Sequence, residues 1–296
     1  MRAKGQTGRT LPEDSPDVLK HLGDSLETRW TRYRTRLKRC QARFSEEAVH
    51  QSRVETRRLL ATVELLSAFI PARDIEKARR TLKHHLDTFD DLRDTQVQLV
   101  YVGQMIESHP AARTFQDWLR KREVRFTRQT RKAIKRIRTK RLGRRVAVFA
   151  KEIRQQRKRT PPERAFSAVQ LAMNRAFARV AQLCRRVQGE DTETIHCTRV
   201  AFKRFRYMVE ALSPLLPAIT EEHCHAMRGY QSMMGDIQDV EVLLAALDKF
   251  IRKRERKDPV TQKLRSELQR RRQSLIRVYL NAAGKLRLFW PLRGSN

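Results

Sequence analysis

The segment His50-Gln51-Ser52-Arg53-Val54, followed by Arg57-Arg58, occurs twice in this chain. It returns 146 residues later as His196-Cys197-Thr198-Arg199-Val200, followed by Lys203-Arg204. The correspondence continues through Val63-Glu64 and Val209-Glu210, and after a one-residue gap it aligns Phe89 with Met234 and Asp94 with Asp239. A repeat of this length indicates one structural unit used twice. Because the unit repeats a histidine and a row of cations, it points to an anionic ligand.

Helix signals dominate the rest of the chain. Apolar residues recur at three- and four-residue spacing in runs of about 15 to 25 residues, and no alternating strand pattern of useful length appears. The sequence therefore predicts an all-α fold. The expected helices cover 17–43, 46–70, 74–88, 91–108, 112–157 with a break near Gly143, 163–188, 192–213, 220–234, 236–256 and 260–287.

The duplication also predicts the domain organisation. Residues 1–16 are polar and are expected to form a flexible N-terminal tail. Residues 17–160 would form a first helical bundle and residues 161–296 a second, joined at Thr160-Pro161-Pro162.

The charge of the chain is extreme for its length, because 65 Lys and Arg against 33 Asp and Glu give a formal net charge of +32 over 296 residues. Such a protein repels itself, and nucleic acid, an anionic membrane surface or inorganic polyphosphate would relieve the repulsion. The alternative is a charged surface that serves solubility alone.

Four scattered cysteines without a CxxC pair favour a reducing compartment, and no uncharged apolar run approaches the about 18 residues of a membrane span. We therefore expect a cytoplasmic protein with no membrane partner.

Helical geometry separates each repeated segment into two faces. With about 100° per residue, Arg53 and Arg57 lie within about 60° of His50, while Leu59, Val63 and Leu66 lie on the opposite side. The second copy places His196, Arg199 and Lys203 opposite Phe205, Val209 and Leu212. A solvated charged face is the usual meaning of such a stripe. Like charges four residues apart repel unless an anion bridges them, however, and guanidinium groups suit phosphate oxygens.

Other aligned positions extend the pattern. Lys83 aligns with Arg228, again a cation with a cation. Asp94 and Asp239 are expected in the first turn of a helix, as caps or as partners of an Arg, and Glu64 and Glu210 are expected to orient an Arg. The tract 113–159 holds 20 Lys and Arg against three acids, and it could extend a polyanion track, bind nucleic acid or be a solvated surface.

With these residues in view, the chain resembles the CHAD family, whose name refers to a histidine in an α-helical domain. The second copy carries the clearer signature, His196-x-x-Arg199-Val200-x-x-Lys203-Arg204-Phe205-Arg206-Tyr207-x-x-Glu210. A later family element, roughly Leu-Gly-x-x-Arg-Asp-x-x-Val, appears twice with two departures: Asp90 replaces the glycine in the first copy, and Gln238 replaces the arginine in the second.

The resemblance implies two pseudo-symmetric helical bundles with a basic cavity or pore between them. It also implies a stand-alone, non-catalytic protein that binds inorganic polyphosphate and associates with polyphosphate granules. The contacts that it transfers to this chain are His50, Arg53, Arg57, Lys83, His196, Arg199, Lys203 and Arg228, with Arg58, Arg204 and Arg206 as secondary contacts.

Two other functions stay open at this stage. A nucleic-acid-binding helical protein fits the charge, although no helix-turn-helix signature appears and aromatic residues make up only 7%. A metal-dependent phosphohydrolase would use helix histidines as ligands, but the neighbouring arginines would repel a metal ion. We therefore expect no catalytic residue, metal or cofactor, and the sequence carries no signal for an oligomeric state.

Overall fold

The computed structural model describes residues 16–110, 112–253 and 259–290, and within them every regular element is a helix. The all-α prediction is therefore confirmed. The tail predicted at 1–16 lies outside the described residues except for Pro16. The elements are α1 (Val18–Ala42), α2 (Glu46–Leu65), η1 (Leu66–Ala68), α3 (Ala72–Asp87), α4 (Asp90–Met105), α5 (Ala112–Arg136), α6 (Lys140–Arg159), α7 (Pro162–Cys184), α8 (Thr192–Leu212), η2 (Ser213–Leu215), α9 (Glu221–Arg252), α10 (Pro259–Ala282) and η3 (Ala283–Leu288).

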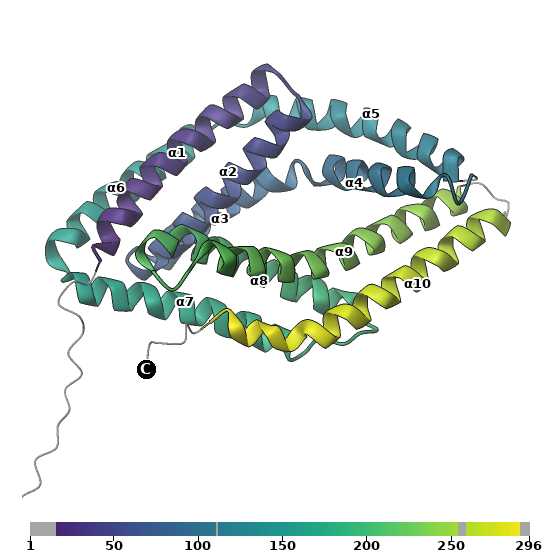
Figure 1. The fold of residues 1–296 in the computed structure, drawn as a ribbon. Helices are drawn as coiled ribbons and strands as arrows, with labels where there is room; N and C mark the ends of the chain where they lie inside the picture. The colour runs from purple at the N-terminus through teal and green to yellow at the C-terminus, as the bar shows by residue number, and fades with distance from the viewer. Residues whose placement is uncertain (1–15, 111, 254–258, 291–296) are drawn as a thin grey trace, which may run out of the picture.

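The two repeated segments lie at the centre of this arrangement, on α2 and α8. Helix α1 packs against α2 and α6, α7 packs against α8, and α2 and α8 are direct neighbours. At the other end of the molecule the pairs α4–α5 and α9–α10 extend side by side (Figure 1). Helices from both parts of the chain therefore surround the repeated pair. Among the described helices, none combines the length and the apolar composition required to cross a membrane.

Both repeated helices begin at a side-chain cap. Ser45 accepts a hydrogen bond from the Ala48 N–H at 3.2 Å at the start of α2, and Asp191 accepts one from the Glu193 N–H at 3.0 Å at the start of α8. Such caps satisfy N–H groups that have no partner within the helix. Each repeated histidine is consequently the fifth residue of its helix.

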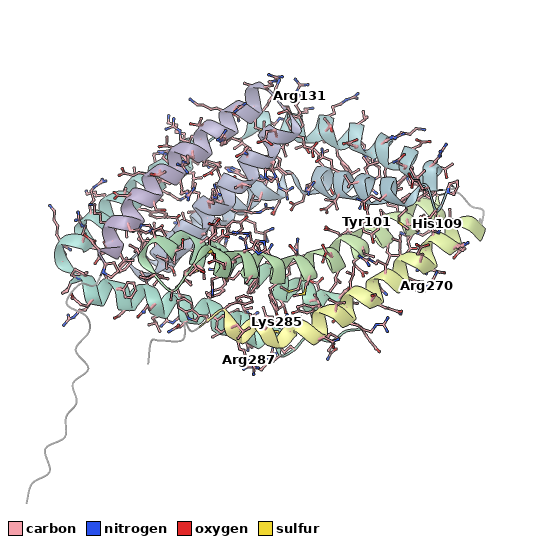
Figure 2. All side chains as sticks on the ribbon, in the orientation of Figure 1. Tyr101, His109, Arg131, Arg270, Lys285 and Arg287 are labelled. Atoms are coloured by element: carbon pink, nitrogen blue, oxygen red, sulfur yellow. The ribbon has the colours of Figure 1, made fainter. Side chains whose placement is uncertain are left out.

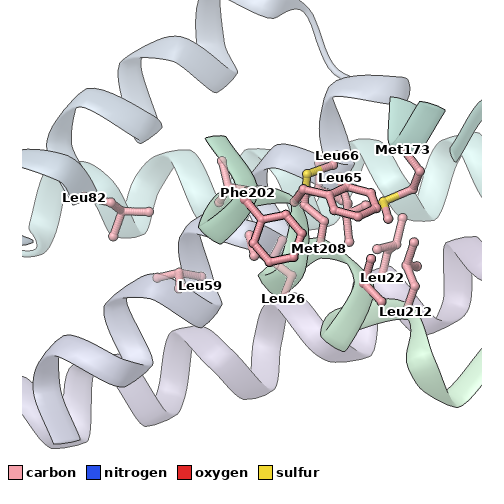
Figure 3. Close-up of a cluster of buried hydrophobic side chains, with 14 of the residues drawn as sticks. Leu22, Leu26, Leu59, Leu65, Leu66, Leu82, Met173, Phe202, Met208 and Leu212 are labelled. Carbon is pink, nitrogen blue, oxygen red and sulfur yellow. The ribbon is translucent and has the colours of Figure 1, made fainter. Parts of the chain in front are cut away.

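The apolar faces of the two repeated helices enter one common core. Leu59 and Val63 of α2 and Phe205 and Val209 of α8 are fully buried, as the helical projection predicts. Figure 3 shows the cluster that they belong to, with side chains from α1, α2, α7 and α8. A second, smaller cluster lies where α4, α5, α9 and α10 meet. The shared core fixes α2 and α8 relative to each other, because close-packed side chains leave little freedom to shift.

One predicted helix boundary is wrong. The segments expected at 220–234 and 236–256 form the single helix α9, which continues through Gly235 and ends at Arg252. A glycine inside a helix costs about 1 kcal/mol relative to alanine. The flanking Met234 and Ile237 are buried in the core, and their packing keeps the helix continuous.

The break expected near Gly143 lies earlier in the chain. Helix α5 ends at Arg136 and α6 begins at Lys140, so the chain turns at 137–139 and Gly143 lies inside α6. A Cβ atom at position 143 would come within 2.9 Å of Trp30 Cζ2. Gly143 therefore allows α6 to approach α1 closely.

Candidate anion-binding cavity

An open cavity of about 1990 Å³ lies between α2, α3, α4, α7, α8 and α9. Both repeated helices line it, so the two copies of the motif meet at one site. The lining includes eight of the residues predicted as contacts, namely His50, Arg53, Arg57, Lys83, His196, Arg199, Lys203 and Arg204.

Three predicted contacts lie outside the lining, where they pair with carboxylates of the protein. Arg58 forms an ion pair with Glu55 at 2.8 Å. Arg206 is buried and pairs with Glu210, which also contacts Arg228 at 3.5 Å. These three side chains stabilise the surrounding helices from positions outside the cavity.

The lining also contains four arginines that were not assigned as contacts from the sequence: Arg79, Arg93, Arg175 and Arg179. Arg175 and Arg179 lie four residues apart on α7, and Arg79 lies four residues before Lys83 on α3. Like charges at this spacing are the same signal that singled out the repeated stripes. These pairs could have been found in the sequence by their spacing. They were not singled out because they do not recur in the other copy of the repeat.

Cations from the two copies crowd together at the centre of the cavity. Burial, followed by the charges of Arg57, Arg199 and Arg53, lowers the pKa of Lys203 to about 7. Lysines ordinarily titrate near 10.5, so the surroundings strongly disfavour a further positive charge at this point. Arginines of both copies thus act on Lys203, and a bound anion would favour its charged form.

Two arginine nitrogens in the cavity lack a partner. The Nε atoms of Arg53 and Arg199 are buried and, among the described residues, have no hydrogen-bond acceptor. These arginines occupy matched positions in the two copies. An unpaired buried donor costs about 1 to 3 kcal/mol, and more when it is charged. Oxygen atoms of a bound anion would supply the missing acceptors.

The lining is not uniformly basic, since it contains ten Lys and Arg together with eight Asp and Glu. Some of the acids are paired with cations of the site. Glu64 of the first copy lies 2.6 Å from Nε of Arg204 in the second, so it holds an arginine across the interface, in line with the orienting role expected for it. Most of the excess charge of the chain consequently lies on other surfaces.

Asp94 and Asp239 have a different position from the one predicted. Helix α4 begins at Asp90 and α9 at Glu221, so neither aspartate is in a first turn and a capping role is wrong for both. Burial raises the pKa of each carboxyl group, and it brings the pKa of Asp94 to about 6. The nearby Arg53 and Arg199 partly oppose these shifts, so each aspartate interacts electrostatically with the arginine of its own copy without forming a close ion pair.

Gln238, which departs from the family pattern, orients one of the two histidines. His196 Nδ1 donates a hydrogen bond to Gln238 Oε1 at 2.7 Å. The amide oxygen can only accept, so Nδ1 carries a proton and Nε2 is left for another partner. Protonation of Nε2 would turn that atom into a donor for an anion.

The basic tract 113–159 contributes no residue to the cavity lining. Most of its cations are exposed on the outer faces of α5 and α6. Arg131 on α5 and Arg270 on α10 illustrate the outward direction of such side chains (Figure 2). Over the described part of the chain, no group of three or more His, Cys, Asp or Glu is placed to hold a metal ion.

Comparisons with known proteins identify the family through a family model and the fold through solved structures. A family model described as the CHAD domain matches residues 25–248. The crystal structure of the CHAD domain from the plant Ricinus communis superimposes with a TM-score of 0.64 at 17% identity, covering 95% of this chain and 98% of the other. PptA from Streptomyces chartreusis gives a TM-score of 0.65 at 15% identity, covering 90% and 98%. A search of curated proteins found no match.

Proposed function

We propose that this protein, which belongs to the CHAD family, binds inorganic polyphosphate in the central cavity without hydrolysing it. The observation that carries the proposal is the meeting of two matched sets of cations in one cavity, where Arg53 and Arg199 each keep an unpartnered Nε. Guanidinium groups offer phosphate oxygens a fork of charge-assisted hydrogen bonds. Polyphosphate carries about one negative charge per phosphate along a flexible chain, so it can follow cations contributed by several helices.

The lining favours polyphosphate over a nucleic acid. Proteins that bind single-stranded nucleic acid stack the bases on aromatic side chains. Tyr207 is the one aromatic residue among those that line the cavity, and the Arg206 guanidinium lies 4.3 Å from its ring centroid. The cavity therefore offers donors for phosphate groups and little surface for bases.

A binding role without hydrolysis fits the chemistry of the lining. Metal-assisted phosphate hydrolysis needs a cluster of ligands that holds a divalent cation. Among the described residues, no group of three or more His, Cys, Asp or Glu is placed to hold such an ion. In the cell, binding of this kind would bring the protein to polyphosphate granules in the cytoplasm.

Alanine substitutions at neighbouring positions of α2 test the proposal. Arg57 lines the cavity, whereas the adjacent Arg58 lies outside it and pairs with Glu55. Arg57→Ala should weaken polyphosphate binding about tenfold, since a hydrogen bond to a charged group contributes about 1.5 to 3 kcal/mol. Arg58→Ala removes the same charge and should bind like the unmodified protein in a calorimetric titration.

Equal losses of polyphosphate affinity in Arg57→Ala and Arg58→Ala would show that the polymer binds to a surface outside the cavity. Displacement of polyphosphate by double-stranded DNA, at equal phosphate and salt concentrations, would favour the nucleic-acid alternative. Release of orthophosphate during incubation with polyphosphate and Mg²⁺ would establish hydrolysis and reject the non-catalytic role.

A further inference from the structure

Asp90 and Gly235 occupy the same position in the two copies of the repeat, because Phe89 aligns with Met234. The residue that follows the aligned pair is acidic in the first copy and has no side chain in the second. Both positions lie next to the matched arginines, Arg53 and Arg199. This difference changes what each arginine can bind.

In the first copy, Asp90 already occupies the arginine. Its Oδ1 atom lies 3.4 Å from Arg53 Nη2. The Asp90 carboxylate also interacts electrostatically with Arg57 and with Lys203 of the second copy. One internal carboxylate therefore competes with an incoming anion for three cations of the cavity.

In the second copy, Gly235 leaves the arginine open. A Cβ atom at this position would lie 3.6 Å from Arg199 Nε, so the guanidinium rests against the glycine backbone. Among the described residues no carboxylate oxygen comes within ion-pair distance of Arg199, in contrast to Arg53. Asp239, Asp94 and Asp236 act on Arg199 only from beyond that distance, so none of the described carboxylates directly occupies its guanidinium.

A second difference between the copies offsets the charge of the first at these two positions. Arg93 of the first copy aligns with Gln238 of the second, so the first copy has one more acid and one more cation. Arg93 is exposed, whereas Gln238 holds His196 through Nδ1. The second half therefore combines an arginine that has no close ion pair with a described residue and an oriented imidazole. The first half combines an arginine held by Asp90 with an exposed His50.

We infer that the Arg199 half is the tighter phosphate subsite of the cavity, and that Asp90 weakens the Arg53 half by holding its arginine. The inference rests on the proposed function. An anion gains most where a preoriented donor set has no internal competitor, because it then displaces no existing ion pair. The subsite would take one phosphate group of a polyphosphate chain, and the remaining phosphates would extend toward Arg53.

Exchange of the two residues tests the inference, with tripolyphosphate as the probe in calorimetric titrations at fixed salt and pH. Gly235→Asp should lower the affinity about tenfold by giving Arg199 an internal partner. Gly229→Asp is its control: Gly229 lies on the same helix outside the cavity, and a Cβ atom there meets nothing within 4 Å. This control should bind like the unmodified protein.

The reciprocal variant, Asp90→Gly, should raise the affinity about threefold, since it frees Arg53. Its control is Asp91→Gly, which removes the neighbouring first-turn carboxylate of α4 from a position outside the lining. Both substitutions change the net charge by the same amount and place a glycine in the same turn. A difference in affinity between Asp90→Gly and Asp91→Gly therefore depends on where the removed carboxylate lies, because the total charge is the same in both.

The outcomes separate this inference from the proposed function. Binding by the unmodified protein that is weakened in Arg57→Ala and not in Arg58→Ala supports the cavity as the site. If Gly235→Asp then matches Gly229→Asp, or if Arg53→Ala loses as much affinity as Arg199→Ala, the unequal subsites are rejected and the proposed function stands. Absence of binding by the unmodified protein rejects both. Circular dichroism and thermal unfolding identify any variant that fails to fold.

Discussion

Lys203 shows most clearly how the repeat creates a property that neither copy has alone. Its pKa falls to about 7 because this half-buried side chain is desolvated and because Arg53 and Arg57 of the first copy add to Arg199 of its own helix. Near neutral pH the free cavity therefore holds a lysine that is only partly protonated. A bound polyanion favours the charged form, so binding and proton uptake are coupled.

The affinity for polyphosphate is expected to fall as the pH rises from about 6 to 8.5, with the decrease starting near 7 and continuing above it. Above pH 7 binding must protonate Lys203, and this costs free energy that grows with pH. Lys203→Arg keeps the charge throughout this range and should remove that part of the pH dependence. Titrations in two buffers of different ionisation enthalpy measure the proton uptake directly. An unchanged pH profile in Lys203→Arg would exclude Lys203 as the titrating group.

The same pKa shift predicts a conflict between stability and binding. Lys203 titrates near 7 in the folded protein and near 10.5 ordinarily, so the unfolded chain binds more protons between these values. The contribution of Lys203 to stability therefore rises with pH through this window and is most unfavourable below pH 7. Lys203→Met should raise the Tm of the ligand-free protein by about 2 °C at pH 6 and by less at pH 9.

The measurement for this variant is thermal unfolding followed by circular dichroism at several pH values. Polyphosphate affinity should decrease in the same variant, because a charge of the cavity is lost. A Tm that falls at pH 6 would contradict the view that the Lys203 charge is destabilising.

At the level of helices, the cavity and the basic tract are separate features. The residues of 113–159 lie on α5 and α6, and none lines the cavity. Lys121, Arg125 and Arg128 are exposed on α5. Solvent-exposed cations of this kind contribute mainly to long-range attraction, which salt screens.

Reversal of these three charges to Glu should slow association with polyphosphate at low salt and weaken non-specific DNA binding. At 0.15 M salt, where the Debye length is about 8 Å, the polyphosphate Kd should change less than in Arg57→Ala. Stopped-flow association rates and equilibrium titrations measure the two effects. A larger loss of equilibrium affinity than in Arg57→Ala would make α5 part of the binding site.

The packing of α1 against α6 depends on a glycine at the contact. Gly143→Ala places a Cβ atom within 2.9 Å of the Trp30 ring and should destabilise the protein by about 1 to 3 kcal/mol. Gly229→Ala is the matched change in an open part of α9, where alanine should stabilise the helix by about 0.5 to 1 kcal/mol. Urea unfolding gives both values. Equal effects would show that Trp30 moves aside without cost.

For the molecule as a whole, the proposed ligand should act as a structural clamp. The cavity is lined by α2, α3 and α4 from the first half of the chain and by α7, α8 and α9 from the second. A ligand that binds only the folded protein at 100 times its Kd adds about 2.7 kcal/mol of stability. Polyphosphate should therefore raise the Tm, and the increase should shrink as salt rises because bound counterions are released on binding.

Differential scanning fluorimetry with and without polyphosphate measures this stabilisation. The double variant Arg57→Ala/Arg199→Ala should lose most of it, while retaining any non-specific effect of the outer surface. A full Tm increase in the double variant would assign the stabilisation to the outer cations.

The helices and their buried faces could be predicted from the sequence because they depend on local periodicity. Leu59, Val63, Phe205 and Val209 are apolar at helical spacing, and all four are buried. The ends of the helices were less predictable, since tertiary packing can override the local helix propensity of a residue. Gly235 was expected to end a helix, but the buried neighbours of this glycine keep α9 continuous.

An all-α chain and two helices with the same cations in the same register could be predicted from the sequence, because neighbouring residues encode both features. Which of those cations share a cavity depends on how the helices pack. Arg57 and Arg204 line it and Arg58 does not, although Arg58 and Arg204 are aligned. The physical reason is that a side chain's surroundings depend on which helices pack against its own. Those contacts also decide that Asp90 forms an ion pair with Arg53, while the matching position next to Arg199 is a glycine.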